Sequence, residues 1–294
     1  MVDIPKFWTW ATVRLRKRNF MRKWENNDRI RKLVKNVVFT GWGEDMSEKP
    51  LSLFWERILN REVQLKYVDL RAVCLSNVAL QGEGDDDEGN DKDDTSILAK
   101  ALVKIEEVNL NYPYETKFIL NDKQLTPIFT EIMETDDLRL KKLYLNHNDL
   151  SGVPSEVLSS AFVKLEEVEY NCREIWLRKD QVLLYLSKDQ VQAVLNKISN
   201  TAEEDMKLRY LEINPLPGEY VESMDPDVLK TVFLKIDWYL DNWFIIPTKV
   251  MKDIFLTIQD DEKQAHKIEQ NVGEGYIPWE DGLRPFLEVT EIDY

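Results

Sequence analysis

The sequence predicts an α/β solenoid, in which short parallel strands form a concave face and helices cover the outside. Two sets of similar segments support this fold. In the first set, ALVKIEEVNLN from Ala101 and AFVKLEEVEYN from Ala161 match at most of their positions, and VFLKIDWYLDN from Val232 is a weaker copy. The second set alternates with the first along the chain and comprises LKYVDL from Leu65, LKKLYL from Leu140 and LRYLEI from Leu208. Self-similarity at a period of about 25 to 43 residues is typical of solenoids.

Each unit is expected to be a short strand followed by a helix. In KKLYLN, Leu143 and Leu145 are two residues apart and point to one side of a strand, whereas Tyr144 points to the other. The apolar residues of 157–165 recur at helical spacing and predict one buried helix face. Asp225-Pro226 supplies the N-cap and first-turn proline of a later helix. Neither element buries its apolar side alone, so the units are expected to stack.

One segment carries a family resemblance. LKKLYLNHNDL, from Leu140 to Leu150, resembles the LxxLxLxxNxL signature of leucine-rich repeats. Asn148 stands where that family places a buried asparagine that hydrogen-bonds the turning backbone. The alternation of two repeat types is similar to the ribonuclease-inhibitor-like subfamily, over roughly residues 30 to 260. The resemblance implies about seven repeats. We expect a short, irregular arc, because the other units replace the asparagine with Val73, Pro113, Arg173, Leu216 and Phe244.

The two ends are expected to be caps. We place a basic N-terminal cap at residues 1–33, the repeats at 34–260 and a C-terminal cap or tail at 261–294. Residues 1–36 hold eleven Lys or Arg and three Asp or Glu. A capping helix that includes Leu15 and Phe20 would cover the first repeat. Its exposed basic side chains would be open to an acidic or nucleic-acid partner, and they are Arg16, Lys17, Arg18, Arg22 and Lys23.

A second resemblance lies in the cap. KFWTWATVRL, from Lys6 to Leu15, is similar to the tryptophan-bearing stretch that joins the F-box to the first strand in F-box proteins with leucine-rich repeats. The F-box would lie upstream, so we expect either its loss or a fragment of a longer chain. This resemblance implies a substrate receptor of a ubiquitin ligase.

The acidic run at residues 83–94 is expected to be a solvated loop inserted between two repeats. A calcium loop is the alternative, but Gly89 and the missing closing glutamate do not fit that pattern.

No motif for catalysis, a cofactor or a metal is found, so we predict a protein that is not an enzyme. His147 and His266 lie outside any zinc-binding pattern. His147 and Cys172 occupy equivalent turns of neighbouring units, but no motif supplies the orienting group that a Cys–His pair needs. Glycine-rich phosphate loops are missing as well. The few cysteines favour a cytoplasmic or nuclear location, and no apolar run reaches the roughly 20 residues of a membrane span.

The strand positions that point away from the core are the candidate partner-binding residues. On the concave face we expect Tyr67, Asp69, Glu107, Asn109, Tyr144, Glu167, Glu169, Tyr210, Glu212 and Trp238. Aromatic anchors among acids suit a protein with a basic surface, and a solvated sheet face is the alternative. The net charge of −15 disfavours a general nucleic-acid binder. A column of asparagines is expected to be structural, and it comprises Asn111, Asn146, Asn171, Asn214 and Asn242.

The sequence thus predicts a non-enzymatic protein-binding scaffold. The alternatives are the ligase receptor and an architectural subunit of a large assembly, which includes ribonucleoproteins.

Overall fold

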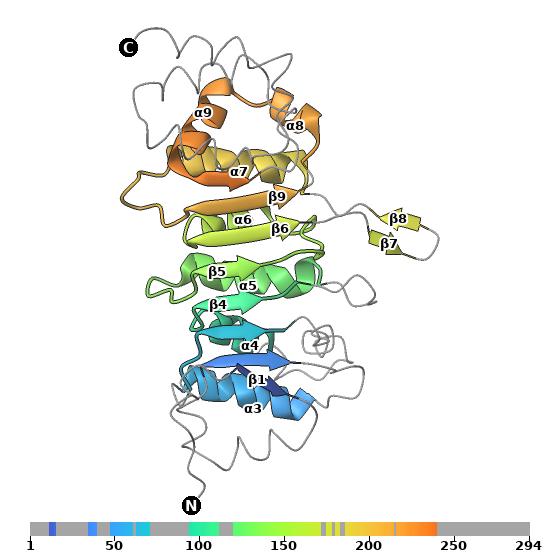
Figure 1. Cartoon of the computed structure of the whole chain (residues 1–294), viewed down its shortest axis with the longest axis vertical. Helices are drawn as coiled ribbons and strands as arrows, with labels where there is room; N and C mark the ends of the chain where they lie inside the picture. The colour runs from blue at the N-terminus through green and yellow to red at the C-terminus, as the bar shows by residue number, and fades with distance from the viewer. Residues whose placement is uncertain are drawn as a thin grey trace, which may run out of the picture.

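The computed structural model shows an α/β protein built on one parallel sheet. It describes residues 12–15, 35–39, 48–60, 63–70, 94–111, 120–171, 175–177, 180–182, 186–214 and 216–239. Eight strands follow the order β1-β2-β3-β4-β5-β6-β9-β10, and all their pairings are parallel. Figure 1 shows the strands stacked along the long axis of the molecule, with α4, α5, α6 and α7 behind them.

Strands and helices alternate along the chain. The sheet strands are β1 (Thr12–Leu15), β2 (Asn36–Phe39), β3 (Tyr67–Asp69), β4 (Glu107–Asn109), β5 (Lys142–Tyr144), β6 (Glu167–Asn171), β9 (Tyr210–Asn214) and β10 (Asp237–Tyr239). The helices that connect them are α3 (Glu48–Leu59), α4 (Asp94–Leu102), α5 (Asp122–Glu134), α6 (Ser155–Phe162), α7 (Lys188–Asn200), α8 (Gly218–Glu222) and α9 (Pro226–Lys235). The α/β class is therefore confirmed, and the sequential parallel order is compatible with a solenoid.

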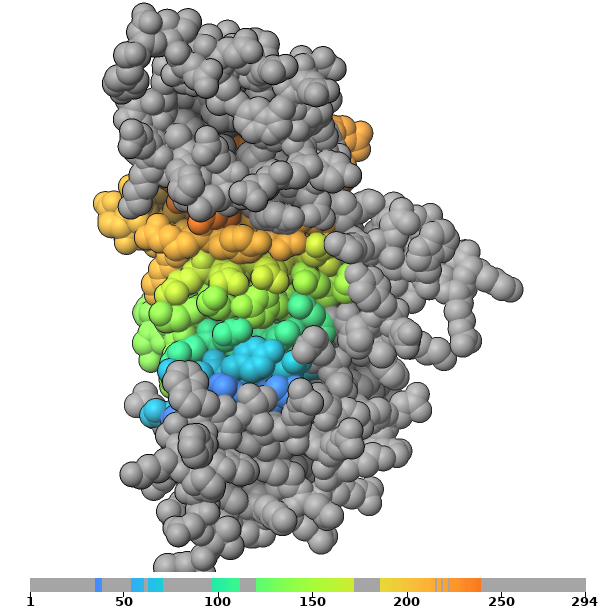
Figure 2. All heavy atoms as spheres, viewed as in Figure 1, coloured from blue at the N-terminus to red at the C-terminus, as the bar shows by residue number. Residues whose placement is uncertain are grey.

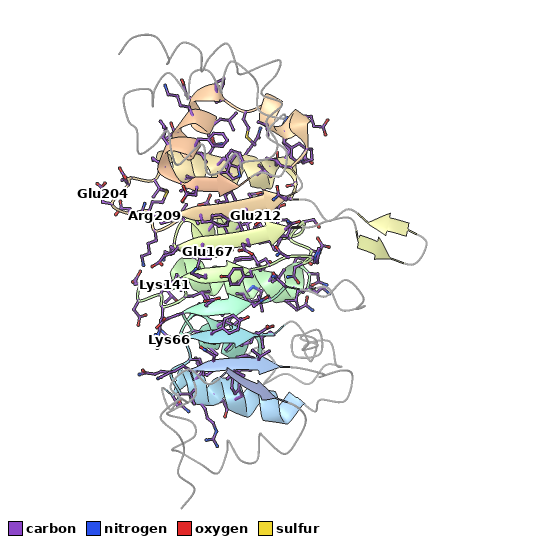
Figure 3. All side chains as sticks on the ribbon, in the orientation of Figure 1. Lys66, Lys141, Glu167, Glu204, Arg209 and Glu212 are labelled. Atoms are coloured by element: carbon purple, nitrogen blue, oxygen red, sulfur yellow. The ribbon has the colours of Figure 1, made fainter. Side chains whose placement is uncertain are left out.

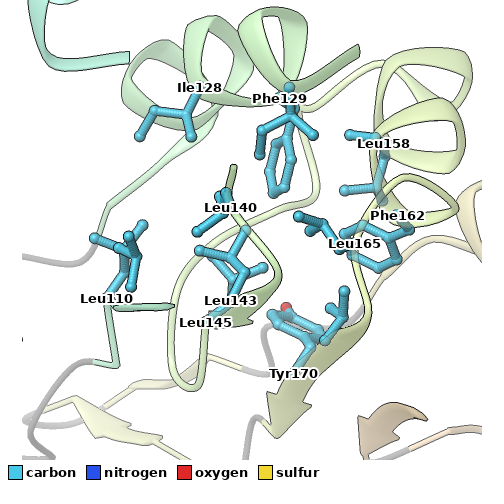
Figure 4. Close-up of a cluster of buried hydrophobic side chains, with 14 of the residues drawn as sticks. Leu110, Ile128, Phe129, Leu140, Leu143, Leu145, Leu158, Phe162, Leu165 and Tyr170 are labelled. Atoms are coloured by element: carbon cyan, nitrogen blue, oxygen red, sulfur yellow. The ribbon is translucent and has the colours of Figure 1, made fainter. Parts of the chain in front are cut away.

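The core lies between the sheet and the helices, as the strand pattern predicts. Leu143 and Leu145 are fully buried, whereas Tyr144 between them stays partly exposed. Phe129 of α5 and Phe162 of α6 meet edge-on, with ring centroids 5.9 Å apart. Figure 4 shows these side chains gathered between the strands and the two helices. Burial of side chains of this size supplies the main favourable contribution to stacking the units.

Helix starts follow capping chemistry in three places. Asn121 and Ser187 accept hydrogen bonds from the first turns of α5 and α7, and Gln124 and Gln190 complete capping boxes. Asp225 caps α9, with Pro226 in the first turn, which confirms the prediction for that segment.

Two helix ends are completed by lysines from the next unit. The Lys164 ammonium donates to the carbonyls of Met133 and Thr135 at the end of α5. The Lys235 ammonium donates to Ile198, Ser199 and Thr201 at the end of α7. A positive charge is favourable there, because the C-terminus of a helix is the negative end of its dipole. These lysines occupy the same position in the repeated segments of 161–171 and 232–242.

The structure departs from expectation at the first strand and after β6. Leu15, predicted to lie in a capping helix, belongs to strand β1, which pairs with β2. A two-stranded antiparallel hairpin, β7 (Ile175–Leu177) and β8 (Asp180–Val182), is inserted after β6. In Figure 1 it projects to the side of the sheet.

Three other predictions concern segments that fall outside the described residues. These are the five basic residues of the cap, the acidic run up to residue 93 and the segment 261–294.

Candidate functional site: the acidic sheet face

Two rows of strand positions lie in register on the side of the sheet opposite the helices. The first row, one residue per strand from β3 to β10, is Tyr67, Glu107, Lys142, Glu167, Tyr210 and Asp237. The second row is Asp69, Asn109, Tyr144, Glu169, Glu212 and Tyr239. We call these twelve positions the acidic sheet face. They alternate with buried residues such as Val108 and Val168, as a strand with one buried side requires.

Seven of the ten predicted residues lie on this face and are partly exposed: Tyr67, Glu107, Tyr144, Glu167, Glu169, Tyr210 and Glu212. Figure 2 shows the side chains of β3, β4, β5, β6 and β9 open on this side of the molecule. Asp69 and Asn109 occupy the face by register, but they are only 2% and 9% exposed. Their predicted accessibility is therefore wrong.

Trp238 does not belong to the face. It is fully buried and pairs in register with Leu211, which is itself a core residue. The segment that leads into β10 has one acid where the other copies have two, Glu106 and Glu107 or Glu166 and Glu167. A shift of one residue moves every side chain of a strand to the opposite face.

Asp237 and Tyr239 consequently take the positions that were assigned to Trp238 and Leu240. The alternation of Ile236, Trp238 and Leu240 with polar neighbours was the sequence signal for this register.

The carboxylate of Glu167 is satisfied from β5. The Tyr144 hydroxyl donates to Glu167 Oε1 at 3.1 Å, and Lys142 forms an ion pair with the other oxygen. Glu167 is 21% exposed. Burial and the nearby charges of Glu107 and Glu167 raise the pKa of the Tyr144 phenol, so it remains a neutral donor.

The carboxylate of Glu212 is held by three neutral donors. Tyr210 Oη donates at 3.2 Å, Asn171 Nδ2 at 2.8 Å and Asn214 Nδ2 at 3.1 Å. Both oxygens of this carboxylate therefore have hydrogen-bond donors. Figure 3 labels Glu167 and Glu212 on neighbouring strands.

Glu169 lies between these two residues and differs from both. Burial and then the like charges of Glu212 and Glu167 raise the pKa of Glu169 to about 7, and Lys142 opposes the rise. Within the described part of the chain, no hydrogen-bond donor reaches the Glu169 carboxylate. Its environment therefore disfavours the charged form near neutral pH.

A row of alternating charges borders the acidic sheet face where the strands begin. Lys66, Glu106, Lys141, Glu166 and Arg209 alternate in sign along the sheet, and Figure 3 shows the three basic members at this edge. Lys141 meets Glu166 at 2.8 Å, and a hydrogen bond to Glu166 raises the pKa of Lys141. Glu106 meets Arg139 at 2.8 Å, and this hydrogen bond lowers the pKa of Glu106. Acids and bases therefore pair along this border, whereas acids predominate on the face itself.

Asparagines form a ladder where the strands end. Asn111 Oδ1 accepts from the backbone N–H of Asn146, and Asn146 Oδ1 accepts from that of Asn171, both at 2.6 Å. These three residues are structural, as expected, and Asn242 lies outside the described residues.

Asn148 is fully buried and occupies the turn after β5. Its Nδ2 donates to Leu110 O and to Leu145 O, each at 2.9 Å. It therefore links the turns of two successive units.

Neither a metal-binding group nor a membrane-spanning helix is found among the described residues. They contain no group of three His, Cys, Asp or Glu arranged to hold a metal ion. His147 lies in a turn with a φ of 65° and is nearly buried, while Cys172 falls outside the described residues. Across the described ranges, no helix combines the length and apolarity that a bilayer crossing requires.

No protein-family model matches the chain, and no curated protein matches it either.

Proposed function

We propose that this chain is a leucine-rich-repeat solenoid that binds a protein with a basic surface through the acidic sheet face. Three observations support the repeat assignment. The strands follow one another in order, a helix connects each successive pair from β2 onward, and Asn148 makes the two turn contacts expected of the repeat asparagine. A solenoid presents its strand face as an extended binding surface.

The charge of the acidic sheet face carries the proposal about the partner. Its twelve positions include one lysine, Lys142, the buried Asp69 and five partly exposed carboxylate residues: Glu107, Glu167, Glu169, Glu212 and Asp237. Lys142 is already paired with Glu167, so the other acids still give this surface a negative potential. A surface of one sign accelerates encounter with a partner of the opposite sign and excludes like-charged proteins.

Tyrosines supply contact area between the acids. Tyr67, Tyr144 and Tyr210 occupy alternate strands and remain partly exposed. Each can pack against the aliphatic part of a lysine or arginine and hold its cation near the ring. We propose a non-enzymatic scaffold that works in the cytoplasm or nucleus.

Affinity capture from native cell extract with quantitative mass spectrometry tests this proposal. The bait variant is Glu107→Gln/Glu167→Gln/Asp237→Asn, which removes three charges from the face. The matched control, Glu134→Gln/Glu203→Gln/Glu204→Gln, removes three exposed charges from the end of α5 and from the connection between α7 and β9.

We expect basic proteins to be captured by the native chain and by the control, and to be lost with the face variant. Their capture should weaken when salt is raised, because exposed charges are screened over about 8–10 Å. Capture of the same proteins by all three baits would contradict the proposal.

Strand β1 favours a second candidate, the substrate receptor of a ubiquitin ligase. The tryptophan-bearing segment that resembles an F-box junction ends with Thr12–Leu15, and these four residues form β1, which pairs in register with β2. Detection of an F-box upstream in longer transcripts, together with co-purification of ligase subunits, would support it.

A further inference from the structure

Resting on the proposed function, we infer that Glu169 and Glu212 together seat one arginine side chain of the basic partner, between Tyr144 and Tyr210. This inference concerns a single place on the acidic sheet face and one functional group, the guanidinium.

The two carboxylates stand directly opposite each other on neighbouring strands. Glu169 of β6 and Glu212 of β9 are Cα partners in register. Like charges in this position destabilise a sheet. A cation placed between them removes the repulsion, and Lys142, the lysine of the acidic sheet face, is committed to Glu167.

Glu169 is the acid of this group that lacks compensation. Glu167 receives the Tyr144 hydroxyl and the Lys142 ammonium, and Glu212 receives three neutral donors. The charged and titratable groups that face Glu169 are Lys142 and Tyr144 on β5, Glu107 on β4, Glu167 on its own strand, and Tyr210 and Glu212 on β9. Three of these six groups are carboxylates and only Lys142 is a cation, so the position attracts a further cation from outside.

The geometry favours guanidinium over ammonium or a metal ion. Neighbouring strands lie about 4.8 Å apart, a spacing that the planar donors of one guanidinium can bridge with hydrogen bonds to both carboxylates. The flanking rings of Tyr144 and Tyr210 offer faces on which a guanidinium can stack. In the described ranges, no cluster of acids, histidines and cysteines forms a metal site.

Arginine binding at this place must release a proton at low pH. Glu169 is protonated below about pH 7, and the cation requires its ionised form. Affinity for an arginine-bearing peptide should therefore rise between pH 6 and pH 8.

Fluorescence anisotropy with labelled twelve-residue peptides tests the inference on the full chain. The probes are (Arg-Gly)₆, (Lys-Gly)₆ and (citrulline-Gly)₆, in which citrulline keeps the shape of arginine without its charge. The proteins are the native chain, Glu169→Gln, the face variant Glu107→Gln/Glu167→Gln/Asp237→Asn and the control Glu204→Gln.

We expect the arginine peptide to bind the native chain more tightly than either other peptide, and more tightly at pH 8 than at pH 6. Glu169→Gln should weaken this binding about tenfold at pH 8 and abolish the pH difference. Its melting temperature should not fall, since the substitution removes an uncompensated charge, and Glu204→Gln should leave binding unchanged.

The outcomes separate the two proposals. Loss of arginine binding in the face variant but not in Glu169→Gln would overturn the seat and leave the proposed function standing. Equal binding of the lysine and arginine peptides would overturn the choice of guanidinium. Equal binding of the citrulline peptide would overturn both the seat and the basic partner.

Discussion

Replacing Asn148 with alanine tests how the turns that follow β4 and β5 are held together. The Asn148 side chain is fully buried and donates two hydrogen bonds of 2.9 Å, to Leu110 O after β4 and to Leu145 O after β5. Asn148→Ala removes both donors at once and leaves two carbonyl groups to find other partners.

The expected cost follows from these two contacts. One hydrogen bond contributes about 0.5–1.5 kcal/mol, and leaving a buried acceptor unsatisfied costs about 1–3 kcal/mol. We therefore expect Asn148→Ala to lower the free energy of unfolding by about 2–4 kcal/mol. At roughly 2 °C per kcal/mol for a chain of this size, the melting temperature should fall by about 4–8 °C. Asn148→Asp should be worse at neutral pH, because a carboxylate has no N–H to donate.

Urea titration followed by circular dichroism measures this loss, with Asp149→Ala as the matched control. Asp149 is the next residue in the same turn, and its carboxylate accepts from Ser151 N at 3.0 Å near the surface. The control should cost less than about 1 kcal/mol. Equal losses from the two alanine substitutions would refute the view that Asn148 fixes the turns.

Three further predictions follow from named contacts. Leu143→Ala should lower the free energy of unfolding by about 2–5 kcal/mol because the side chain is fully buried. Tyr144→Ala should lower it much less. Equal losses of stability in urea titrations would mean that β5 faces the other way. Lys235→Met should cost about 1–2 kcal/mol because three carbonyls at the end of α7 lose a donor, and a similar loss from the exposed control Lys188→Met would contradict this. The folded chain binds more protons at Glu169 between its ordinary pKa of 4.5 and about 7, so stability should fall as pH rises through this window, by about 1 kcal/mol or less because the group is partly exposed. Urea titrations at pH 5 and pH 8 should show a smaller fall for Glu169→Gln, and an identical fall would sink the explanation.

The α/β class and the facing of most strands could be predicted because apolar residues alternate with polar ones. Leu143, Leu145 and Val168 are buried as this period requires, and Asn148 makes the contacts that its motif implies. Local patterns of this kind depend on near neighbours in the chain, which the sequence displays directly.

The errors in the sequence prediction arise where the number of residues before a strand, or packing by residues distant in the sequence, decides whether a side chain is buried. The facing of Trp238 depends on one missing acid before β10, which a comparison of similar segments conceals. Asp69 has the right facing, but its burial depends on the surrounding structure.

The support of Glu212 was equally hidden. Asn171 and Asn214 read as members of a structural column, yet both also donate to this carboxylate. The hydrogen bond from Asn171 joins residues 41 positions apart, and a contact of that separation leaves no local signal in the sequence.

The lysines that complete α5 and α7 make local unfolding spread more easily in one direction along the chain than in the other. Lys164 follows α6 in sequence but caps α5, and Lys235 is the last residue of α9 but caps α7. A helix whose last carbonyls are held by the following unit frays when that unit opens. Local unfolding should therefore spread toward the N-terminus more easily than toward the C-terminus. During synthesis, the end of α7 gains this support only once Lys235 has left the ribosome. The ends of α5 and α7 are therefore stabilised only after the segment that follows each of them has been made.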